Sequence, residues 1–591
     1  MCGIVGSIGY SNPKDYIING LKMLDYRGYD SAGIGYFDDG IKICKDVGSV
    51  DHLSTLIPKS IKTNIMIGHT RWATHGRPSK TNTHPHLSFN KKICLVHNGV
   101  IDNYLEIKDF LLNKGYKFYG ETDSEIVANL LEYYYLSYKD IIESIKKVIS
   151  IIKGSYAIAF FKSDDDNTLY VFKNTSPLII GIGSNYNLIA SDASPMISHT
   201  NKFIELDDHE YGEIGSNYIN IYDKDGIKIN KRYIEKDIES ISHDLKGYPH
   251  YMLKEIEEIS DVVERIISNY YFNDEFQFNK DLINDLKESD HIIFIGCGTS
   301  YHASLVGGRY FEYVNKSTSK FIASEWAFHP VFPGNKPFII LISQSGETAD
   351  LIHCQKIIKE HNLNNLIITN TSGSTLFRNS KYTLLLHAGV EVSVASTKAY
   401  VAQVTLLSLL ASSLDNKNIV DDLRNSIKIV DDIKQNYKPI IMDVASKLKD
   451  ESNIFYLGRG FDYFLSLEAS LKLKEVSYIH SEAVPGGELK HGPIALIDKD
   501  VPVVVFVTDP MTATSMRVNI EEVKSRGAKV FVVSTKELSM ENDSIIVDDY
   551  PYFLSSVAIS SIAFYLAYYV SLFKGLNVDK PRNLAKSVTV E

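Results

Sequence analysis

Short apolar runs dominate the first 235 positions of the chain, and polar residues or glycines separate them. Eight of these runs predict β-strands: residues 3–8, 34–37, 65–69, 92–97, 156–161, 169–173, 178–182 and 218–222. Apolar residues recur at helical spacing at 103–112 and 124–135. The pattern predicts an α+β domain over residues 2–235, built from stacked sheets flanked by helices.

The pattern changes near residue 235. Positions 234–247 are charged and polar, and Gly247 and Pro249 punctuate this stretch. Such a composition is typical of an exposed connector, so we predict a linker at 236–250. Beyond it, apolar residues at helical spacing predict an amphipathic helix that opens the second part: Met252, Ile256, Ile259, Val263, Ile266 and Tyr270.

A weak internal repeat organises the second part. In the first copy, HIIFIGCGTS predicts a strand and a Gly-rich turn, FIILISQSGETAD a strand leading through a Ser/Thr loop into a helix, and NLIITNTSG a third strand. The segments NIFYLGRGFD, VPVVVFVTDP and KVFVVSTKE follow in the same order about 160 residues later. Strands this rich in Val and Ile are typical of parallel sheets buried on both faces. We therefore predict two α/β domains, at 280–421 and 445–581, and a C-terminal tail at 582–591.

Two uncharged apolar runs resemble membrane spans. Residues 399–414 are too few to cross about 30 Å of hydrocarbon, and residues 551–573 are numerous enough but include several serines. Because the two runs occupy matching positions in the repeat, we expect buried core helices. A terminal membrane anchor is the alternative.

Composition excludes several classes of protein. The 591 residues are 44% hydrophobic and 23% charged, which excludes a disordered chain. The net charge is −11 and no stretch concentrates basic residues, so we expect no nucleic-acid partner. The five cysteines form no C-x-x-C pair, and the first residues lack the pattern of a secretory signal. These features favour a cytoplasmic protein.

Cys2 is a candidate nucleophile. If Met1 is removed, the Cys2 α-amine lies beside its thiol, and their reference pKa values, about 8 and about 8.5, are matched for proton transfer. A thiol activated in this way needs no histidine. Position alone, however, favours an ordinary residue of an edge strand.

Six motifs place Cys2 in a wider pattern: MCGIVG, YRGYDSAG, GHTRWATHG, HPH, VHNG and GETDSE. Together they resemble the class II glutamine amidotransferase domain, an N-terminal-nucleophile fold of two packed sheets flanked by helices. The resemblance implies that Cys2 forms a γ-glutamyl thioester, and that Asn98 and the N–H of Gly99 form the oxyanion hole. Donors in such a hole stabilise charge that develops only in the tetrahedral intermediate.

The same resemblance assigns the glutamine pocket. Arg71 would bind the α-carboxylate and Asp123 the α-ammonium group, and further residues would line and close the pocket: Trp72, Thr74 and His75. Locally, Asp123 also fits the N-cap of a helix. His84 and His86 could be metal ligands, but no further ligands at zinc spacing accompany them, so we expect no metal and no cofactor.

Hydroxyl-rich segments at strand ends predict a phosphate site in the second part. SQSGET at 343–348 joins an apolar strand to a helical pattern, and a helix N-terminus binds phosphate through N–H groups without a lysine. CGTS at 297–300 and VASTK at 394–398 add more hydroxyls. A plain Ser-rich turn is the alternative. Neither G-x-x-x-x-G-K-[ST] nor G-x-G-x-x-G occurs, which argues against nucleotide hydrolysis and dinucleotide redox chemistry.

The second part resembles the paired sugar isomerase domains of the glutamine:fructose-6-phosphate aminotransferase family. The motifs that carry this resemblance are GCGTSYHAS, LISQSGETAD, VASTKA, LGRG, LEASLKLKEVSYIHSEA, GGELKHGP and DKPRNLAKSVTVE. It implies that seven residues hold the phosphate and hydroxyls of the substrate: Thr299, Ser300, Ser343, Gln344, Ser345, Thr348 and Ser396.

The resemblance also implies catalytic roles. Lys586 would form a Schiff base with the open-chain ketose, and Glu475 would move the proton between C1 and C2, since an imine acidifies the neighbouring C–H. His491 would assist ring opening, and Lys472 would stabilise the enolamine charge. Lys472 and Glu475 are three positions apart, so they share a helix face, where the simpler explanation is a surface salt bridge.

These expectations describe a two-step enzyme. Glutamine is hydrolysed at Cys2, ammonia passes internally, and fructose 6-phosphate becomes glucosamine 6-phosphate, the first step of hexosamine biosynthesis. The family implies a homodimer in which His491 completes the partner's site. The rival hypothesis is a phosphosugar-binding regulator with an inactive glutaminase domain. Phosphoribosyl amidotransferase and asparagine synthetase are further rivals, but their characteristic loops are absent from the sequence.

Overall fold

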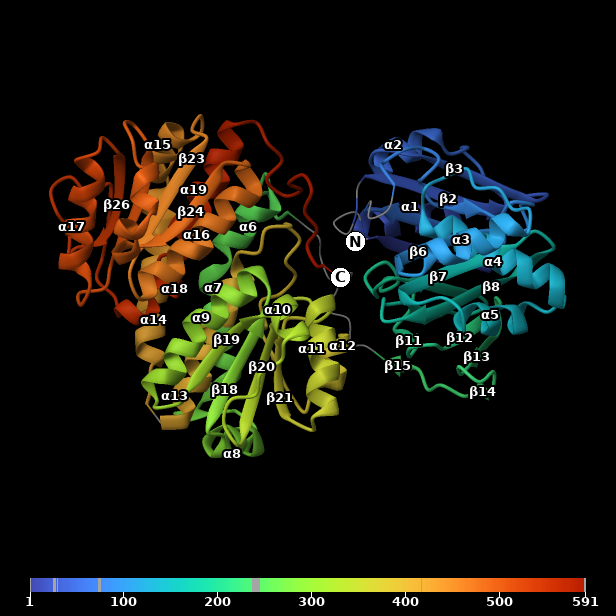
Figure 1. The fold of residues 1–591 in the computed structure, drawn as a ribbon, viewed down its shortest axis with the longest axis horizontal. Helices are drawn as coiled ribbons and strands as arrows, with labels where there is room; N and C mark the ends of the chain where they lie inside the picture. The colour runs from blue at the N-terminus through green and yellow to red at the C-terminus, as the bar shows by residue number, and fades with distance from the viewer. Residues whose placement is uncertain are drawn as a thin grey trace. The chain divides into compact units, whose positions relative to one another are not determined.

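A computed structural model describes residues 2–24, 28, 30–72, 76–235, 245–415 and 417–588 (Figure 1). The chain divides into two compact units, residues 1–242 with 587–591 and residues 243–586, which are described separately below. Most of the predicted linker at 236–250 lies outside the described residues.

The first unit contains two antiparallel sheets. The strands of the first are β1 (Gly3–Ile8), β2 (Ser31–Phe37), β3 (Ile41–Val47), β4 (Ile65–Arg71), β9 (Ile179–Ile182), β10 (Asn187–Ala190), β11 (Lys202–Glu205) and β15 (Ile234–Glu235). Those of the second are β5 (His86–Leu87), β6 (Ile93–Ile101), β7 (Gly154–Lys162), β8 (Asp165–Asn174), β12 (Tyr211–Ile214), β13 (Ile219–Tyr222) and β14 (Lys228–Ile229). Their orders are β15-β11-β9-β10-β1-β4-β2-β3 and β14-β13-β12-β8-β7-β6-β5.

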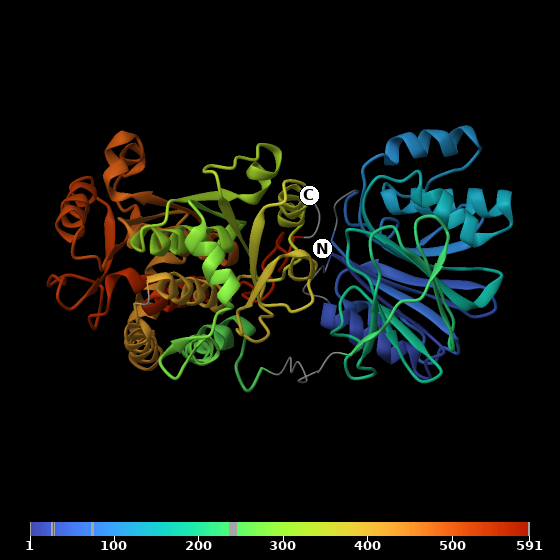
Figure 2. The ribbon, with the colours of Figure 1, turned by 90° about the horizontal axis from the view of Figure 1, so that it is seen from below.

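The two sheets pack face to face over a shared apolar core that includes Ile4, Ile67, Val96 and Ala159. Helices α1 (Pro13–Leu24) and α2 (Val50–Leu56) cover the outer face of the first sheet. Helices α3 (Tyr104–Asn113), α4 (Asp123–Tyr138) and α5 (Ile141–Ile149) cover the second. Figure 2 shows these layers edge-on. The predicted α+β fold of stacked sheets flanked by helices is confirmed.

The second unit contains two parallel five-stranded sheets. Their strands are β18 (His291–Gly296), β19 (Thr318–Ile322), β20 (Pro337–Ser343), β21 (Asn364–Thr369) and β22 (Tyr382–Leu385), then β23 (Asn453–Gly458), β24 (His480–Pro485), β25 (Pro502–Val507), β26 (Lys529–Thr535) and β27 (Ile545–Val547). The orders β19-β18-β20-β21-β22 and β24-β23-β25-β26-β27 are the same permutation. The internal repeat predicted from the sequence therefore corresponds to two copies of one parallel α/β fold, as predicted. A small hairpin, β16 (Tyr271–Phe272) with β17 (Glu275–Phe276), precedes the first copy.

Helices surround both sheets of the second unit (Figure 1). Before and within the first copy they are α6 (Tyr251–Glu257), α7 (Ile259–Tyr270), α8 (Lys280–Glu288), α9 (Gly298–Tyr313), α10 (Ala323–Phe328), α11 (Ala349–Glu360), α12 (Thr375–Asn379) and α13 (Lys398–Asp415). After it come α14 (Val420–Asp432), the π-helix η2 (Ile433–Tyr437), α15 (Lys438–Leu448), α16 (Phe461–Ser477), the 3₁₀ turns η3 (Gly486–His491), η4 (Pro493–Leu496) and η5 (Tyr552–Leu554), and α17 (Ala513–Lys524), α18 (Ser555–Ala558) and α19 (Ser560–Phe573).

The two apolar runs form α13 and the α18–α19 segment, and both lie in the largest core cluster, which spans the two copies. Among the described residues, one stretch is long and apolar enough to cross a membrane, Tyr552–Phe573, and 94% of its most apolar window is buried inside the protein. This burial agrees with the predicted core helices, since the apolar surface is already covered by the protein.

Helices α9 and α13 approach closely at Gly307. A Cβ built on Gly307 would lie 2.5 Å from Cδ1 of Leu407, which is fully buried. At the neighbouring Gly308, a Cβ would instead meet Cε of Lys320, the far end of a flexible side chain. Only the first contact is with a side chain that the core holds in place.

We expect Gly307→Ala to lower the free energy of unfolding by about 1 to 3 kcal/mol, because overpacking outweighs the better helix propensity of alanine. Urea-induced unfolding of the purified chain measures this. Gly308→Ala is the matched control, and equal destabilisation by both variants would contradict the packing argument.

Candidate active sites

In the first unit, the Cys2 thiol lies beside the end of β4. The N–H of Trp72 points at Cys2 Sγ, 3.2 Å away, and the thiol donates to the Trp72 carbonyl at 3.5 Å. The antiparallel pairing of β1 with β4, which sets Gly3 opposite Thr70, brings these segments together. Burial raises the pKa of the Cys2 thiol, while the Trp72 N–H and the Arg71 charge act in the opposite direction. Met1 lies outside the described residues, so the free α-amine of Cys2 stays a prediction.

Asn98, on β6, is held beside Cys2 by hydrogen bonds from both the nitrogen and the oxygen of its side-chain amide. Its Nδ2 donates to the Cys2 carbonyl at 3.0 Å and to Ser191 Oγ at 2.8 Å, and its Oδ1 accepts from His69 Nε2 at 3.0 Å. The amide nitrogen therefore lies beside the backbone of Cys2. Gly99 follows with φ +124°, and a Cβ there would lie 1.9 Å from the Ser155 carbonyl oxygen, so only glycine fits this position.

The residues predicted to bind the ends of glutamine are both buried. Arg71 ends β4 and its Nη2 donates to the Gly76 carbonyl at 3.0 Å. Asp123 is the first residue of α4 and accepts from Ile101 N–H at 2.9 Å. The N-cap of this helix is Thr122, whose side chain accepts from Glu125 N–H, so the alternative in which Asp123 is the N-cap is wrong. The predicted pocket residues Thr74 and His75 lie outside the described residues.

Buried imidazoles pack behind Asn98. The rings of His69 and His84 stack at 4.0 Å, and His86 lies edge-on to His84 at 4.6 Å. Burial lowers the pKa of His69 to about 3 and lowers those of His84 and His86 well below the ordinary value, so these rings are neutral. Within the described ranges, no group of three or more His, Cys, Asp or Glu side chains could hold a metal ion.

In the second unit, the hydroxyl-rich loops follow β18 and β20, adjacent strands whose crossovers run in opposite directions. Ligands of open parallel sheets bind at the carboxyl ends of strands at such a point. Ser343 ends β20, and its Oγ lies 2.9 Å from Thr348 Oγ1 and accepts from Gly346 N–H at 3.0 Å. The Gln344 carbonyl and Ser345 Oγ accept from the N–H groups of Asn370 and Glu347. The loop thus has a fixed, hydroxyl-lined shape in front of α11.

Helix α16 of the second copy carries a charged cluster to α9 of the first. Lys472 Nζ donates to Glu475 at 2.6 Å and to Thr299 Oγ1 at 3.0 Å, and Thr299 Oγ1 donates to Glu468 at 3.0 Å. Burial opposes the charged form of Lys472, but Glu475 and Glu468 outweigh it and raise its pKa. Burial raises the pKa of Glu475, and Lys472 opposes this shift. Lys472 is 1% exposed and Glu475 19%, so their ion pair is not an ordinary surface salt bridge.

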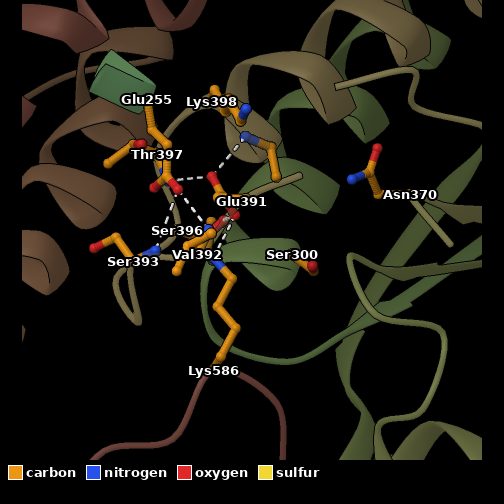
Figure 3. A network of polar contacts seen from close by, with 12 residues as sticks. Glu255, Ser300, Asn370, Glu391, Val392, Ser393, Ser396, Thr397, Lys398 and Lys586 are labelled. Atoms are coloured by element: carbon orange, nitrogen blue, oxygen red, sulfur yellow. Dashed lines mark hydrogen bonds and ion pairs between the residues drawn. The ribbon is translucent and has the colours of Figure 1, made fainter. Parts of the chain in front are cut away.

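The C-terminal tail brings Lys586 to the loop that follows β22. Figure 3 shows the lysine reaching the Glu391 carboxylate, 2.5 Å from its Nζ. Glu391 also accepts from Ser396 Oγ at 2.9 Å and from Thr397 and Ala399 N–H at 2.9 and 3.1 Å. Burial disfavours its charged form, but Lys586 and these N–H groups lower its pKa.

The structure does not bring all of the predicted site residues into these clusters. Ser300 faces α13, where Gln403 Nε2 donates to its Oγ at 3.0 Å. His491 is exposed at the end of η3 and makes no hydrogen bond with the described residues of its own chain.

Three buried carboxylates that the sequence analysis missed contribute to the second unit's site: Glu391, Glu468 and Glu255. The sequence did contain a pattern that could have indicated Glu468, because it precedes Lys472 by four positions on the same helix. No local pattern indicates Glu391 or Glu255, because nothing near them in the sequence distinguishes them from solvated acids.

The second copy uses the corresponding loop differently. The carboxylate of Asp462 accepts from Thr508 N–H at 2.8 Å and from Thr508 Oγ1 at 2.5 Å, after β25. Burial raises the pKa of Asp462 to about 6, so it is mainly ionised at neutral pH. The Asp462 carboxylate thus accepts the hydrogen bonds of the Thr508 donors at this strand end.

Comparisons with known proteins agree with both halves. The model of the glutamine amidotransferase domain matches residues 69–198, and the model of the SIS domain matches residues 285–413 and 447–572. Glutamine–fructose-6-phosphate aminotransferases (isomerizing) of Streptococcus agalactiae serotype III (strain NEM316) and Staphylococcus aureus (strain Mu50) are 41% and 43% identical to this chain, with 100% of both chains covered. The solved C-terminal domain of glucosamine-fructose-6-phosphate aminotransferase from Francisella tularensis covers 57% of this chain and 100% of its own, at 33% identity and a TM-score of 0.54.

Fold and sites together define a glutamine amidotransferase joined to a pair of sugar isomerase domains. The chain belongs to the glutamine–fructose-6-phosphate aminotransferase (isomerizing) family. The names of these full-length relatives do not favour the alternative of a phosphosugar-binding regulator.

The loop at 343–348 yields a test of the phosphate site. Gly346 has φ +67°, and a Cβ there would lie 1.9 Å from Ser374 Oγ. We expect Gly346→Ala to displace the loop and raise the KM for fructose 6-phosphate at least tenfold, while glutamine hydrolysis at the other unit stays intact. Gly575→Ala, with φ +69° and open space around its Cβ, controls for backbone strain. An unchanged KM in Gly346→Ala would remove this loop from the site.

Proposed function

We propose that this chain converts D-fructose 6-phosphate and L-glutamine into D-glucosamine 6-phosphate and L-glutamate. The observation that carries the proposal is that a buried amine, Lys586, meets Glu391 and the hydroxyl-bearing segment 394–398, in the same chain as a Cys2 whose carbonyl accepts from the Asn98 amide. A single assay tests it: purified chain, fructose 6-phosphate and glutamine as the only nitrogen donor should yield glucosamine 6-phosphate.

At the first site, Cys2 attacks the side-chain amide carbon of glutamine. The C–S bond forms, the carbonyl oxygen becomes an oxyanion, and the amide nitrogen leaves as ammonia once it has received a proton. Asn98 Nδ2 and the Gly99 N–H would donate to the oxyanion. Arg71 and Asp123 would bind the charged groups of the substrate, and water then releases glutamate from the thioester.

At the second site, the hydroxyls of the 343–348 loop and of Thr299, Ser300 and Ser396 would hold the sugar phosphate. Lys586 would attack C2 of the open-chain ketose, forming the imine and releasing water. Ammonia transferred internally from the first site replaces the lysine, and Glu475 moves a proton between C1 and C2. Lys472, held between Glu475 and Glu468, would stabilise the negative charge that develops on the enolamine.

The assembly and the setting belong to the same proposal. An exposed His491 without hydrogen bonds to the described part of its own chain supports a homodimer in which it completes the partner's site. Five free cysteines support action in the reducing cytoplasm. We retain the predicted boundaries 2–235, 280–421, 445–581 and 582–591 for the four functional segments.

We expect Cys2→Ala to abolish glutamine hydrolysis, because no other thiol replaces the nucleophile, while phosphosugar isomerisation persists. Glutamate release and the conversion of fructose 6-phosphate to glucose 6-phosphate are measured separately. Cys44→Ala, on β3, is the matched control. Loss of both activities in Cys2→Ala would show that Cys2 has a structural role.

A mixing experiment tests His491. Neither His491→Asn nor Lys586→Arg should form glucosamine 6-phosphate alone. Co-expressed in equal amounts, they should recover about a quarter of the wild-type activity, because half of the dimers are mixed and each of these has one intact site. No recovery would place His491 in its own chain's site.

A further inference from the structure

Three segments far apart in sequence meet around Lys586: helix α6, the loop 391–399 and the C-terminal tail. Asp579, three residues before the tail, accepts from Tyr251 and Met252 N–H, at the start of α6, at 3.0 and 2.8 Å. The Asp579 carbonyl accepts from Val394 N–H of the loop at 3.0 Å. The position of the Lys586 amine therefore depends on how the loop is held against α6.

Glu255 of α6 supplies that support. Its Oε1 accepts from Val392 N–H at 2.5 Å and from Ser393 N–H at 3.2 Å, next to Glu391 in the chain (Figure 3). The residue is only 1% exposed, and its Oε2 is buried without a hydrogen-bond partner among the described residues. A buried carboxylate oxygen without a donor is costly when it is ionised.

The lysines near Glu255 form ion pairs with other acids. Lys586 is paired with Glu391 at 2.5 Å, and Lys398 of α13 with Glu258 at 2.6 Å. Lys254, at the rim, lies 3.8 Å from the same Glu258. Burial and the neighbouring Glu391 raise the pKa of Glu255 to about 8, and Lys586 and Lys398 oppose this only in part. Below pH 8, Glu255 is therefore mainly a neutral acid, and above pH 8 it becomes a second anion near Lys586.

We propose that Glu255 is a positioning residue of the Lys586 site: its carboxyl fixes the loop 391–399, and its ionisation strengthens the hold of the site on the lysine proton. This inference rests on the proposed role of Lys586 in imine formation. Imine formation joins a neutral amine nitrogen to C2 and releases the ketone oxygen as water, so the ammonium must first lose a proton. A neutral Glu255 favours that loss, and an ionised Glu255 opposes it.

The test uses the full chain, fructose 6-phosphate and cyanoborohydride, which reduces the imine to a stable adduct that peptide mass spectrometry locates. Glu255→Gln keeps an acceptor for the two loop N–H groups but stays neutral at every pH. Its trapping rate should equal that of the wild type at pH 7 and exceed it about three- to tenfold at pH 9, where Glu255 of the wild type is mainly ionised. Glu255→Ala, which also removes the acceptor, should lose trapping at both pH values.

Glu264→Gln is the matched control. Glu264 is a half-exposed acid of α7, and this variant should behave as the wild type. Equal rates for Glu255→Gln and the wild type at both pH values would overturn the inference and leave the proposed function standing. No adduct at Lys586 in the wild type would overturn the proposed function, and the inference with it. If Glu255→Gln does not fold, the wild-type profile decides, since the inference requires a second ionisation near pH 8 in its trapping rate and a single ionisation would refute it.

Discussion

A buried charge must be neutralised inside the protein, and this constraint shapes the second unit more than any other interaction. Glu391, Glu468 and Lys472 have almost no contact with solvent, so each depends on partners supplied from elsewhere in the chain. Glu391 is paired with Lys586 of the C-terminal tail and accepts further bonds from its own loop, and the partners of Lys472 come from α16 itself and from the first copy. Removing one partner would leave an uncompensated ion in a dry environment, which typically costs several kcal/mol. The site is therefore stable only as a complete set.

In the first unit, Asn98, the predicted oxyanion-hole residue, has polar neighbours that carry no charge. Its amide is oriented by a neutral histidine on one side and a serine on the other. A charged imidazole behind the predicted oxyanion hole would add a second positive charge to that of Arg71. Burial keeps the ring of His69 neutral, so it acts as a hydrogen-bond donor of fixed direction.

The sequence predicted the elements whose pattern is continuous and missed those defined by distant contacts. The buried strand β20 was predicted because apolar residues fill most of it, and the repeat followed from the order of such strands in the second part. Helix α1 was missed because it follows its strand after a short loop, in a region where strand-like runs prevail. Cys2, Lys472 and Lys586 were predicted from motifs, whereas Glu255 and Glu391 become recognisable only when the fold brings α6, the loop and the tail together. No local spacing encodes such a meeting of segments.

The anion already present at Asp462 has a consequence for what the internal repeat achieved. In the first copy, the strand-end hydroxyls of Ser343 and Thr348 bond to each other, whereas in the second a carboxylate of the chain itself bonds to the strand-end hydroxyl of Thr508 and would repel a phosphate. Under the proposed function, doubling the scaffold did not double the number of sugar sites. The second copy instead contributes helix α16, whose Lys472 and Glu468 bond to Thr299 of the first copy.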